Sequence, residues 1–91
     1  MDELTEAVLQ CCTTVRKENG IAEEPDLSTQ LTRENGIDSM GIVNLVIELE
    51  EALEIDLDQY LARIRGSRTV SELISVIREA AEKENGKERA Q

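Results

Sequence analysis

Ser39 is the residue whose surroundings most favour a chemical role, because it follows Asp38 at the head of the most apolar segment of the chain. The chain contains no histidine, which is the usual general base near neutral pH. No histidine of the same chain can therefore activate this serine hydroxyl, and a self-contained Ser–His hydrolase is excluded. A metal site would have to use carboxylates or the two cysteines.

Those cysteines, Cys11 and Cys12, are adjacent in the sequence. Free cysteine is among the residue types most often buried, so we expect at least one of them to lie in the core of a protein kept in a reducing cytosol. A vicinal disulfide or a redox pair is the alternative. Residues 56–58, Asp-Leu-Asp, suggest a calcium loop, but its glycine and its closing bidentate glutamate are missing at the required spacing. We therefore expect no metal.

The composition predicts one small domain with an aliphatic core, because the 91 residues include one tyrosine and no phenylalanine or tryptophan. Such a core favours helices packed on helices. The formal net charge of -10 disfavours binding to nucleic acid or anionic lipid and attracts proteins with Lys and Arg patches. No apolar run reaches membrane-spanning length, and the first residues lack the basic start of a signal peptide. We expect a monomeric, cytoplasmic protein without membrane insertion.

Helices on either side of a long loop would position Ser39. Apolar residues at spacings of three and four predict a first helix over residues 4–15, which Gly20 ends while Ile21 makes the apolar contact of the cap. The same periodicity predicts a central helix over residues 39–53.

The connection before the central helix, residues 19–38, is long for a compact domain, and connections of this length tend to be functional. Leu27, Leu31 and Ile37 are placed to pin it to the core. Beyond the central helix, a short third helix is predicted over residues 60–64.

A last helix is predicted to begin at Thr69, because Thr69 and Glu72 form a capping box ahead of an apolar stripe. The Asn-Gly pair at residues 85–86 is expected to end it. The sequence thus predicts an all-α domain over residues 1–83 and a flexible C-terminal tail over residues 84–91.

The predicted central helix has two apolar faces at about 100° per residue. One is wide enough to contact a core made by the first and last helices, and it contains Ile42, Leu45, Val46, Leu49 and Leu53. The opposite face contains Met40, Val43 and Ile47. Glu50 and Glu54 border it on one side, and Asn44, Glu48 and Glu51 on the other. The short third helix could cover this second face, or the face could be an exposed surface for docking basic protein partners. The two interpretations are compatible, because the face could be partly covered and partly exposed.

Ser39 also lies at the predicted start of the central helix, where either Asp38 or Ser39 can cap the free backbone N–H groups. The same N–H groups and the positive end of the helix dipole would favour a phosphate attached at or near Ser39.

Residues 36–40, Gly-Ile-Asp-Ser-Met, resemble the Gly-x-Asp-Ser-Leu signature of acyl carrier proteins, and residues 43–51 are similar to their second helix. The resemblance covers roughly residues 4–82. It implies a four-helix bundle of the acyl-carrier type, with three longer helices, one short helix and a long first loop.

In that family the serine carries 4′-phosphopantetheine, which a separate phosphopantetheinyl transferase transfers from coenzyme A. The resemblance therefore implies that Ser39 is the modified residue and that Asp38 supports the transfer. It also implies that the second face of the central helix, with Met40, Val43, Ile47, Glu50 and Glu51, meets partner enzymes. Those partners would be the transferase, an acyl- or aminoacyl-loading ligase, and synthases or transferases with basic docking patches. A carrier needs no general base of its own, so we expect no enzyme activity.

Two residues depart from the family pattern: Asn35 stands where an apolar residue is usual, and Gly41 where an acidic residue is common. Glycine in a first helical turn costs about 0.5–1 kcal/mol relative to alanine, which predicts a looser helix start. Residues 38–41, followed by Val43, Leu45, Glu48 and Leu49, also resemble D-alanyl carrier proteins, whereas residues 54–70 fit that subfamily less well.

The leading hypothesis is a carrier of acyl groups for fatty-acid, polyketide or related biosynthesis. An aminoacyl, D-alanyl or peptidyl carrier is the alternative with the same mechanism. A non-modified acidic helical adaptor is the alternative from another class.

Overall fold

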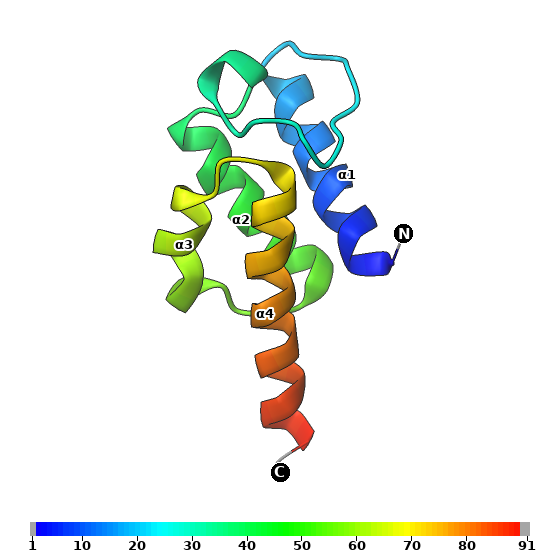
Figure 1. Cartoon of the computed structure of the whole chain (residues 1–91), viewed down its shortest axis with the longest axis vertical. Helices are drawn as coiled ribbons and strands as arrows, with labels where there is room; N and C mark the ends of the chain where they lie inside the picture. The colour runs from blue at the N-terminus through cyan, green and yellow to red at the C-terminus, as the bar shows by residue number, and fades with distance from the viewer. Residues whose placement is uncertain (1, 90–91) are drawn as a thin grey trace.

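The computed structural model describes residues 2–89 and, of these, the side chains of residues 2–83. Its α-helices are α1 (Glu3–Glu18), α2 (Ser39–Leu53), α3 (Leu61–Gly66) and α4 (Val70–Arg89). Two short 3-10 turns, η1 (Arg33–Asn35) and η2 (Asp58–Tyr60), precede α2 and α3. The described residues form no strand, so the predicted all-α bundle of three longer helices and one short helix is confirmed (Figure 1).

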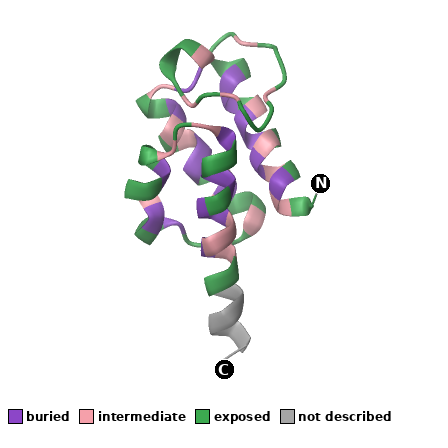
Figure 2. Cartoon of the chain, in the orientation of Figure 1, coloured by how far each residue is buried: buried purple, intermediate pink, exposed green. Residues whose placement is uncertain are grey.

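The core lies between the inward faces of the helices, where the buried residues gather in Figure 2. α1 packs against both α2 and α4, and α3 packs against α4. The side chains with no exposed surface are all aliphatic or cysteine: Val8, Cys12, Leu45, Leu49, Leu57, Ile64, Val70, Leu73, Ile77 and Ala80. The aliphatic core that the composition predicted is therefore present.

α1 is fixed at its start by Asp2. One carboxylate oxygen of Asp2 accepts the Thr5 N–H at 2.8 Å, and the other pairs with the Arg78 guanidinium of α4 at 2.7 Å. The hydrogen bond from Arg78, followed by those from Thr5, holds the pKa of Asp2 well below its ordinary value. The N-cap thus also ties α1 to α4.

The connection between α1 and α2 is held by its backbone to residues around the start of α4. Three hydrogen bonds of 2.8, 3.0 and 2.9 Å do this: Leu31 N–H to the Arg68 carbonyl, Val70 N–H to the Thr29 carbonyl, and Ser71 N–H to the Leu27 carbonyl. Ile37 is buried and Leu31 packs on the core, as predicted. The prediction for Leu27 is wrong, because this residue is 47% exposed. Leu27 attaches the loop through its backbone carbonyl, which accepts the Ser71 N–H, and not through its side chain.

α4 begins with the predicted capping box, since Glu72 N–H donates to Thr69 Oγ1 at 3.3 Å and Thr69 N–H donates to Glu72 Oε2 at 3.1 Å. The predicted end at residues 85–86 is wrong, because α4 continues to Arg89. Gly86 does not end the helix, because a glycine inside a helix costs only about 1 kcal/mol relative to alanine and residues 87–89 contain no proline. The division into a domain over residues 1–83 and a flexible tail over residues 84–91 stays a prediction, and residues 90–91 lie outside the described part of the chain.

Candidate functional site

Ser39 is the first residue of α2, and it is exposed. Asp38 caps the helix, because its Oδ1 accepts the Gly41 N–H at 2.7 Å. Within the described residues, the Ser39 hydroxyl and the N–H groups of Ser39 and Met40 have no hydrogen-bond partner. Asp38 therefore does the capping, and the positive end of the α2 dipole is left open around a serine hydroxyl that has no structural task.

Two turns of the same sequence, Glu-Asn-Gly-Ile at residues 18–21 and 34–37, flank the loop that leads to Ser39. In each turn the glycine has a positive φ, 86° at Gly20 and 83° at Gly36, which other residues resist. In each, the isoleucine N–H reaches back five residues to a carbonyl at 2.9 Å, from Ile21 to Arg16 and from Ile37 to Thr32. Both turns thus end a helical segment in the same way.

The two turns also contact each other. Arg16, which is buried, donates from Nε to the Asn35 carbonyl at 3.0 Å, and Asn19 donates from Nδ2 to the Gly36 carbonyl at 2.9 Å. The Ile21 side chain lies so close to Gly36 that a Cβ there would come within 2.9 Å of it. The end of α1 therefore fixes the backbone immediately before Asp38 and Ser39. The repeated tetrapeptide was the one sequence signal of this contact, and sequence analysis did not identify the pairing.

Gly41 is buried where α2 approaches α1. A Cβ at this position would lie 3.2 Å from both Val15 Cγ1 and Asp38 Oδ1. The glycine, which the sequence predicted to loosen the helix start, therefore allows the close approach of α2 to α1. Asn35, the other departure from the family pattern, has a structural role as well, because its Nδ2 donates to the Gln30 carbonyl at 2.9 Å.

The second apolar face of α2 is exposed. Met40, Val43 and Ile47 are 65%, 37% and 48% exposed, and we call these three residues the outer strip. The short helix α3 therefore does not bury this face, which was one of the two interpretations left open by the sequence. Of the two carboxylates that the family resemblance assigned to partner contact, Glu51 is exposed, whereas Glu50 is half-buried and its Oε2 accepts the Leu57 N–H at 2.9 Å.

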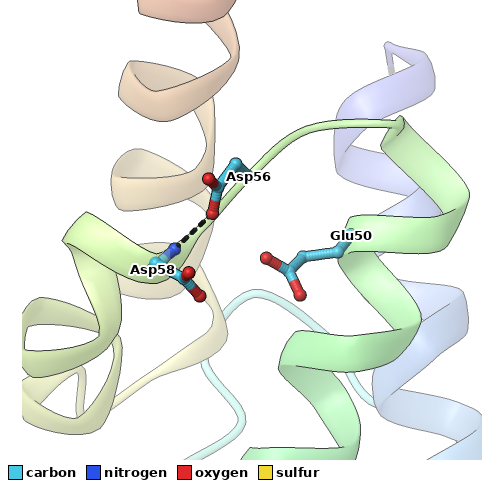
Figure 3. A group of neighbouring side chains, drawn as sticks. All are labelled: Glu50, Asp56 and Asp58. Carbon is cyan, nitrogen blue, oxygen red and sulfur yellow. Dashed lines mark hydrogen bonds between the residues drawn. The ribbon is translucent and has the colours of Figure 1, made fainter.

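Glu50 also belongs to a group of three carboxylates with Asp56 and Asp58, from α2, the following loop and η2 (Figure 3). One carboxylate oxygen of each lies within 4.8 Å of the others. Asp56 Oδ1 accepts the Asp58 N–H at 2.9 Å, and Glu50 accepts the Leu57 N–H, so these side chains order the loop before α3. The expectation of no metal stays a prediction.

A surface hollow of about 500 Å³ opens directly beside Ser39. Its lining includes Asp38 and residues of the outer strip, together with apolar side chains of the loop and two arginines, Arg33 of η1 and Arg65 of α3. Sequence analysis did not assign these arginines to the site. Their positive charge was the sequence signal that could have identified them. Basic residues are the minority in this chain, with 10 lysines and arginines against 20 acidic residues.

Both cysteines are buried free thiols on α1. Burial, with the Glu48 carboxylate adding to it, raises the pKa of Cys11 to about 11. Burial and the neighbouring Cys11 raise the pKa of Cys12 to about 12. The interpretation of Cys11 and Cys12 as core residues is thus confirmed, and the vicinal disulfide is wrong for this structure.

A comparison with protein-family models matches residues 10–77 to the model described as a phosphopantetheine attachment site. The matched segment contains Ser39, both Glu-Asn-Gly-Ile turns and the hollow. Comparisons with curated proteins and with solved structures found no match. Within the described residues, no helix combines the length and apolar character needed to cross a bilayer.

Proposed function

The chain belongs to the family of phosphopantetheine attachment domains, and on that premise we propose that Ser39 is the residue to which 4′-phosphopantetheine is covalently attached. The observation that supports this best is the position of Ser39: an exposed hydroxyl without a hydrogen-bond partner among the described residues, at the open N-terminus of α2. The residues fit the group, because the helix end favours the negative charge of a phosphodiester.

The attachment is a phosphoryl transfer in which this chain is the substrate. The Ser39 oxygen forms a bond to the phosphate of coenzyme A that bears the pantetheine. The phosphoanhydride bond of coenzyme A breaks, adenosine 3′,5′-bisphosphate leaves with the bonding electron pair, and the serine proton passes to a base. We assign that base to the phosphopantetheinyl transferase, in whose active site the hydroxyl reacts; this chain offers no histidine for the task. Asp38 supports the reaction by holding the helix start through its bond to the Gly41 N–H, which leaves the Ser39 hydroxyl without a capping role.

The loaded protein then acts as a carrier and not as an enzyme. The arm supplies a thiol on which acyl groups are held as thioesters, and the protein supplies attachment and recognition. We propose acyl intermediates of fatty-acid, polyketide or related biosynthesis as the cargo. An aminoacyl or D-alanyl cargo is the second candidate, supported by the Asp-Ser-Met-Gly sequence of residues 38–41.

The outer strip is the proposed contact surface for partner enzymes. Its three side chains are exposed apolar groups of α2, and Met40 and Val43 line the same hollow as Ser39. Glu51 adds an exposed carboxylate that would attract basic patches on a ligase, synthase or transferase. Glu50 is less suited to this role than the sequence suggested, because it also binds the Leu57 amide. A cytoplasmic location agrees with the two free thiols.

The test is to incubate the purified chain with coenzyme A, magnesium and a phosphopantetheinyl transferase of broad specificity, and to measure its mass. We expect a gain of one phosphopantetheine unit for the native chain and for Ser71→Ala, which removes an exposed serine in the first turn of α4. We expect no gain for Ser39→Ala. An unchanged native mass would favour the non-modified adaptor, and a gain by Ser39→Ala would show that another residue is modified.

Loading of the modified chain separates the two cargo classes. Acyl-coenzyme A or malonyl-type donors and amino-acid ligases are offered in parallel, and the thioester is identified by mass. Transfer of an amino acid and of no acyl group would replace the leading cargo with the second candidate.

A further inference from the structure

The hollow beside Ser39 is lined by three different segments of the chain. Ser39 belongs to α2, Arg33 to η1 and Arg65 to the last turn of α3. Aliphatic side chains of the loop and of α2 supply apolar lining: Leu31, Ile37 and Ile42. At about 500 Å³ the volume lies within the range of about 300–1,000 Å³ typical of small-molecule sites. The hollow thus has the size and the lining to bind a small molecule that combines an apolar part with negative charge.

Neither of the two arginines is used by the fold. Arg63 pairs with Glu79, and Arg78 pairs with Asp2. In contrast, the side chains of Arg33 and Arg65 are exposed and have no hydrogen-bond or ion-pair partner within the described part of the chain. In a chain with twice as many acidic as basic residues, two unpaired guanidinium groups around one hollow indicate an anionic ligand.

We infer that the hollow binds the nucleotide half of free coenzyme A, adenosine 3′,5′-bisphosphate, while the donor reacts with Ser39. Arg33 and Arg65 bind the 3′- and 5′-phosphates, and the apolar lining contacts the adenosine. This inference rests on the proposed attachment to Ser39. It deepens that proposal, because it gives this chain two residues that recognise the donor before any group is attached.

The chemistry of the transfer brings this ligand to the hollow. The phosphorus that the Ser39 oxygen attacks is joined by one bridging oxygen to the 5′-phosphate of the nucleotide. Because the attacking and leaving oxygens are roughly in line, the nucleotide lies beyond the phosphorus as seen from Ser39. The breaking bond leaves its electron pair, and with it further negative charge, on the departing 5′-phosphate. A cationic group beside Ser39 therefore stabilises the nucleotide as it leaves.

The charge of the chain makes such cationic groups necessary. A net charge of -10 repels a ligand with several phosphates, and the Asp38 carboxylate lines the same hollow. Guanidinium groups bind phosphate oxygens well, so Arg33 and Arg65 counteract this repulsion where the donor approaches Ser39. Both side chains are exposed to solvent, so salt screens the attraction and the nucleotide product can dissociate.

The first experiment titrates adenosine 3′,5′-bisphosphate into the isotope-labelled, unloaded chain and follows amide chemical shifts. This probe contains no pantetheine, so nothing can be attached to Ser39. We expect saturable shift changes at Leu31, Arg33 and Arg65 that weaken with added salt. Arg33→Gln/Arg65→Gln should lose them, and unphosphorylated adenosine should not produce them.

The matched control is Lys17→Gln/Arg68→Gln, which removes the same charge from two exposed residues outside the hollow. It should bind the probe as the native chain does. Shift changes that persist in Arg33→Gln/Arg65→Gln, or that are absent from the hollow, would overturn this inference alone. A normal mass gain at Ser39 in the same preparation would show that the proposed function still holds.

The second experiment measures transferase kinetics with varied donor at a saturating concentration of the chain. For Arg33→Gln/Arg65→Gln we expect kcat/KM for coenzyme A to fall several-fold, and for the control to stay unchanged. The loss should be smaller with 3′-dephospho-coenzyme A, which lacks one of the two phosphates. Equal losses with both donors would overturn the inference, because the arginines would then contact an acidic patch of the transferase. Absence of any mass gain at Ser39 would overturn the proposed function and this inference with it.

Discussion

The two sides of α2 contain the same kinds of residue and have opposite environments. On one side, Leu45 and Leu49 are completely buried and Val46 nearly so. On the other, the outer strip of Met40, Val43 and Ile47 is exposed to solvent. Apolar character alone therefore does not decide which residues form the core. Position around the helix decides it, because α1 lies against one side and, among the described residues, no helix buries the other.

The buried side of α2 also has polar contacts near its N-terminus, which the outer strip lacks. At the start of α2 the helix meets the end of α1, where Arg16 and Asn19 donate to the carbonyls of Asn35 and Gly36. These bonds lie directly before Asp38 and Ser39 in the chain. The contacts with the end of α1 thus fix the position of Ser39, whereas the outer strip does not contribute to fixing it. Four predictions test this division, and the largest expected effect comes first.

Leu49→Ala should destabilise the protein by about 2–5 kcal/mol, because it removes a fully buried side chain and leaves a cavity between helices. Urea unfolding followed by circular dichroism measures the loss. The matched control is Leu27→Ala, a leucine 47% exposed on the loop, for which we expect a change within about 0.5 kcal/mol. Similar losses for the two leucines would mean that the core does not lie where the structure has it.

Asn19→Ala should destabilise the protein by about 1 kcal/mol, because the Gly36 carbonyl loses its side-chain donor. The more specific readout is amide hydrogen exchange, which should become faster at Gly36 and Ile37. Glu18→Ala, an exposed neighbour, is the control and should leave both rates unchanged. Unchanged exchange in Asn19→Ala would show that the contact between the two turns does not hold the loop before Ser39.

The sequence predicted much of this arrangement because helical periodicity is a local signal. α2 has the predicted limits, and the capping box of α4 is present. Contacts between distant backbone segments could not be predicted, because a carbonyl is the same group at every residue. For this reason Leu27 was assigned to the core by its side chain, and the bonds from Arg16 and Asn19 were missed. The hollow was missed too, since Arg33 and Arg65 meet only after folding.

Alkaline pH should reduce stability through the thiols on the buried side of α1. The pKa of Cys11 is raised to about 11 and that of Cys12 to about 12, from an ordinary value of 9.0. Above about pH 9 the unfolded chain therefore loses thiol protons that the folded chain keeps, so the free energy of unfolding falls as the pH rises.

The measurement is the thermal midpoint between about pH 8 and pH 10.5. Cys12→Ala should show a shallower decline than the native chain, even though its midpoint is lower at every pH. Val15→Ala, which also truncates a buried residue of α1, should keep the steep decline. Equal slopes for the two variants would contradict the assignment of the effect to the thiol.

Ile47→Ala should have the smallest effect on stability, within about 0.5 kcal/mol, because its side chain is about half exposed in the free protein. Its effect should appear instead in the kinetics of a partner. Only a minority of interface residues cost more than about 1 kcal/mol when truncated. We expect Ile47, whose exposed apolar side chain belongs to the proposed contact surface, to be one of them, so kcat/KM of the transferase or loading ligase should fall several-fold. Leu27→Ala is the control, because it truncates an apolar side chain of equal exposure away from α2. If Leu27→Ala reduced kcat/KM as much as Ile47→Ala, partner contact would not be confined to α2. If Ile47→Ala instead destabilised the fold as Leu49→Ala does, the two sides of α2 would not differ as the structure requires.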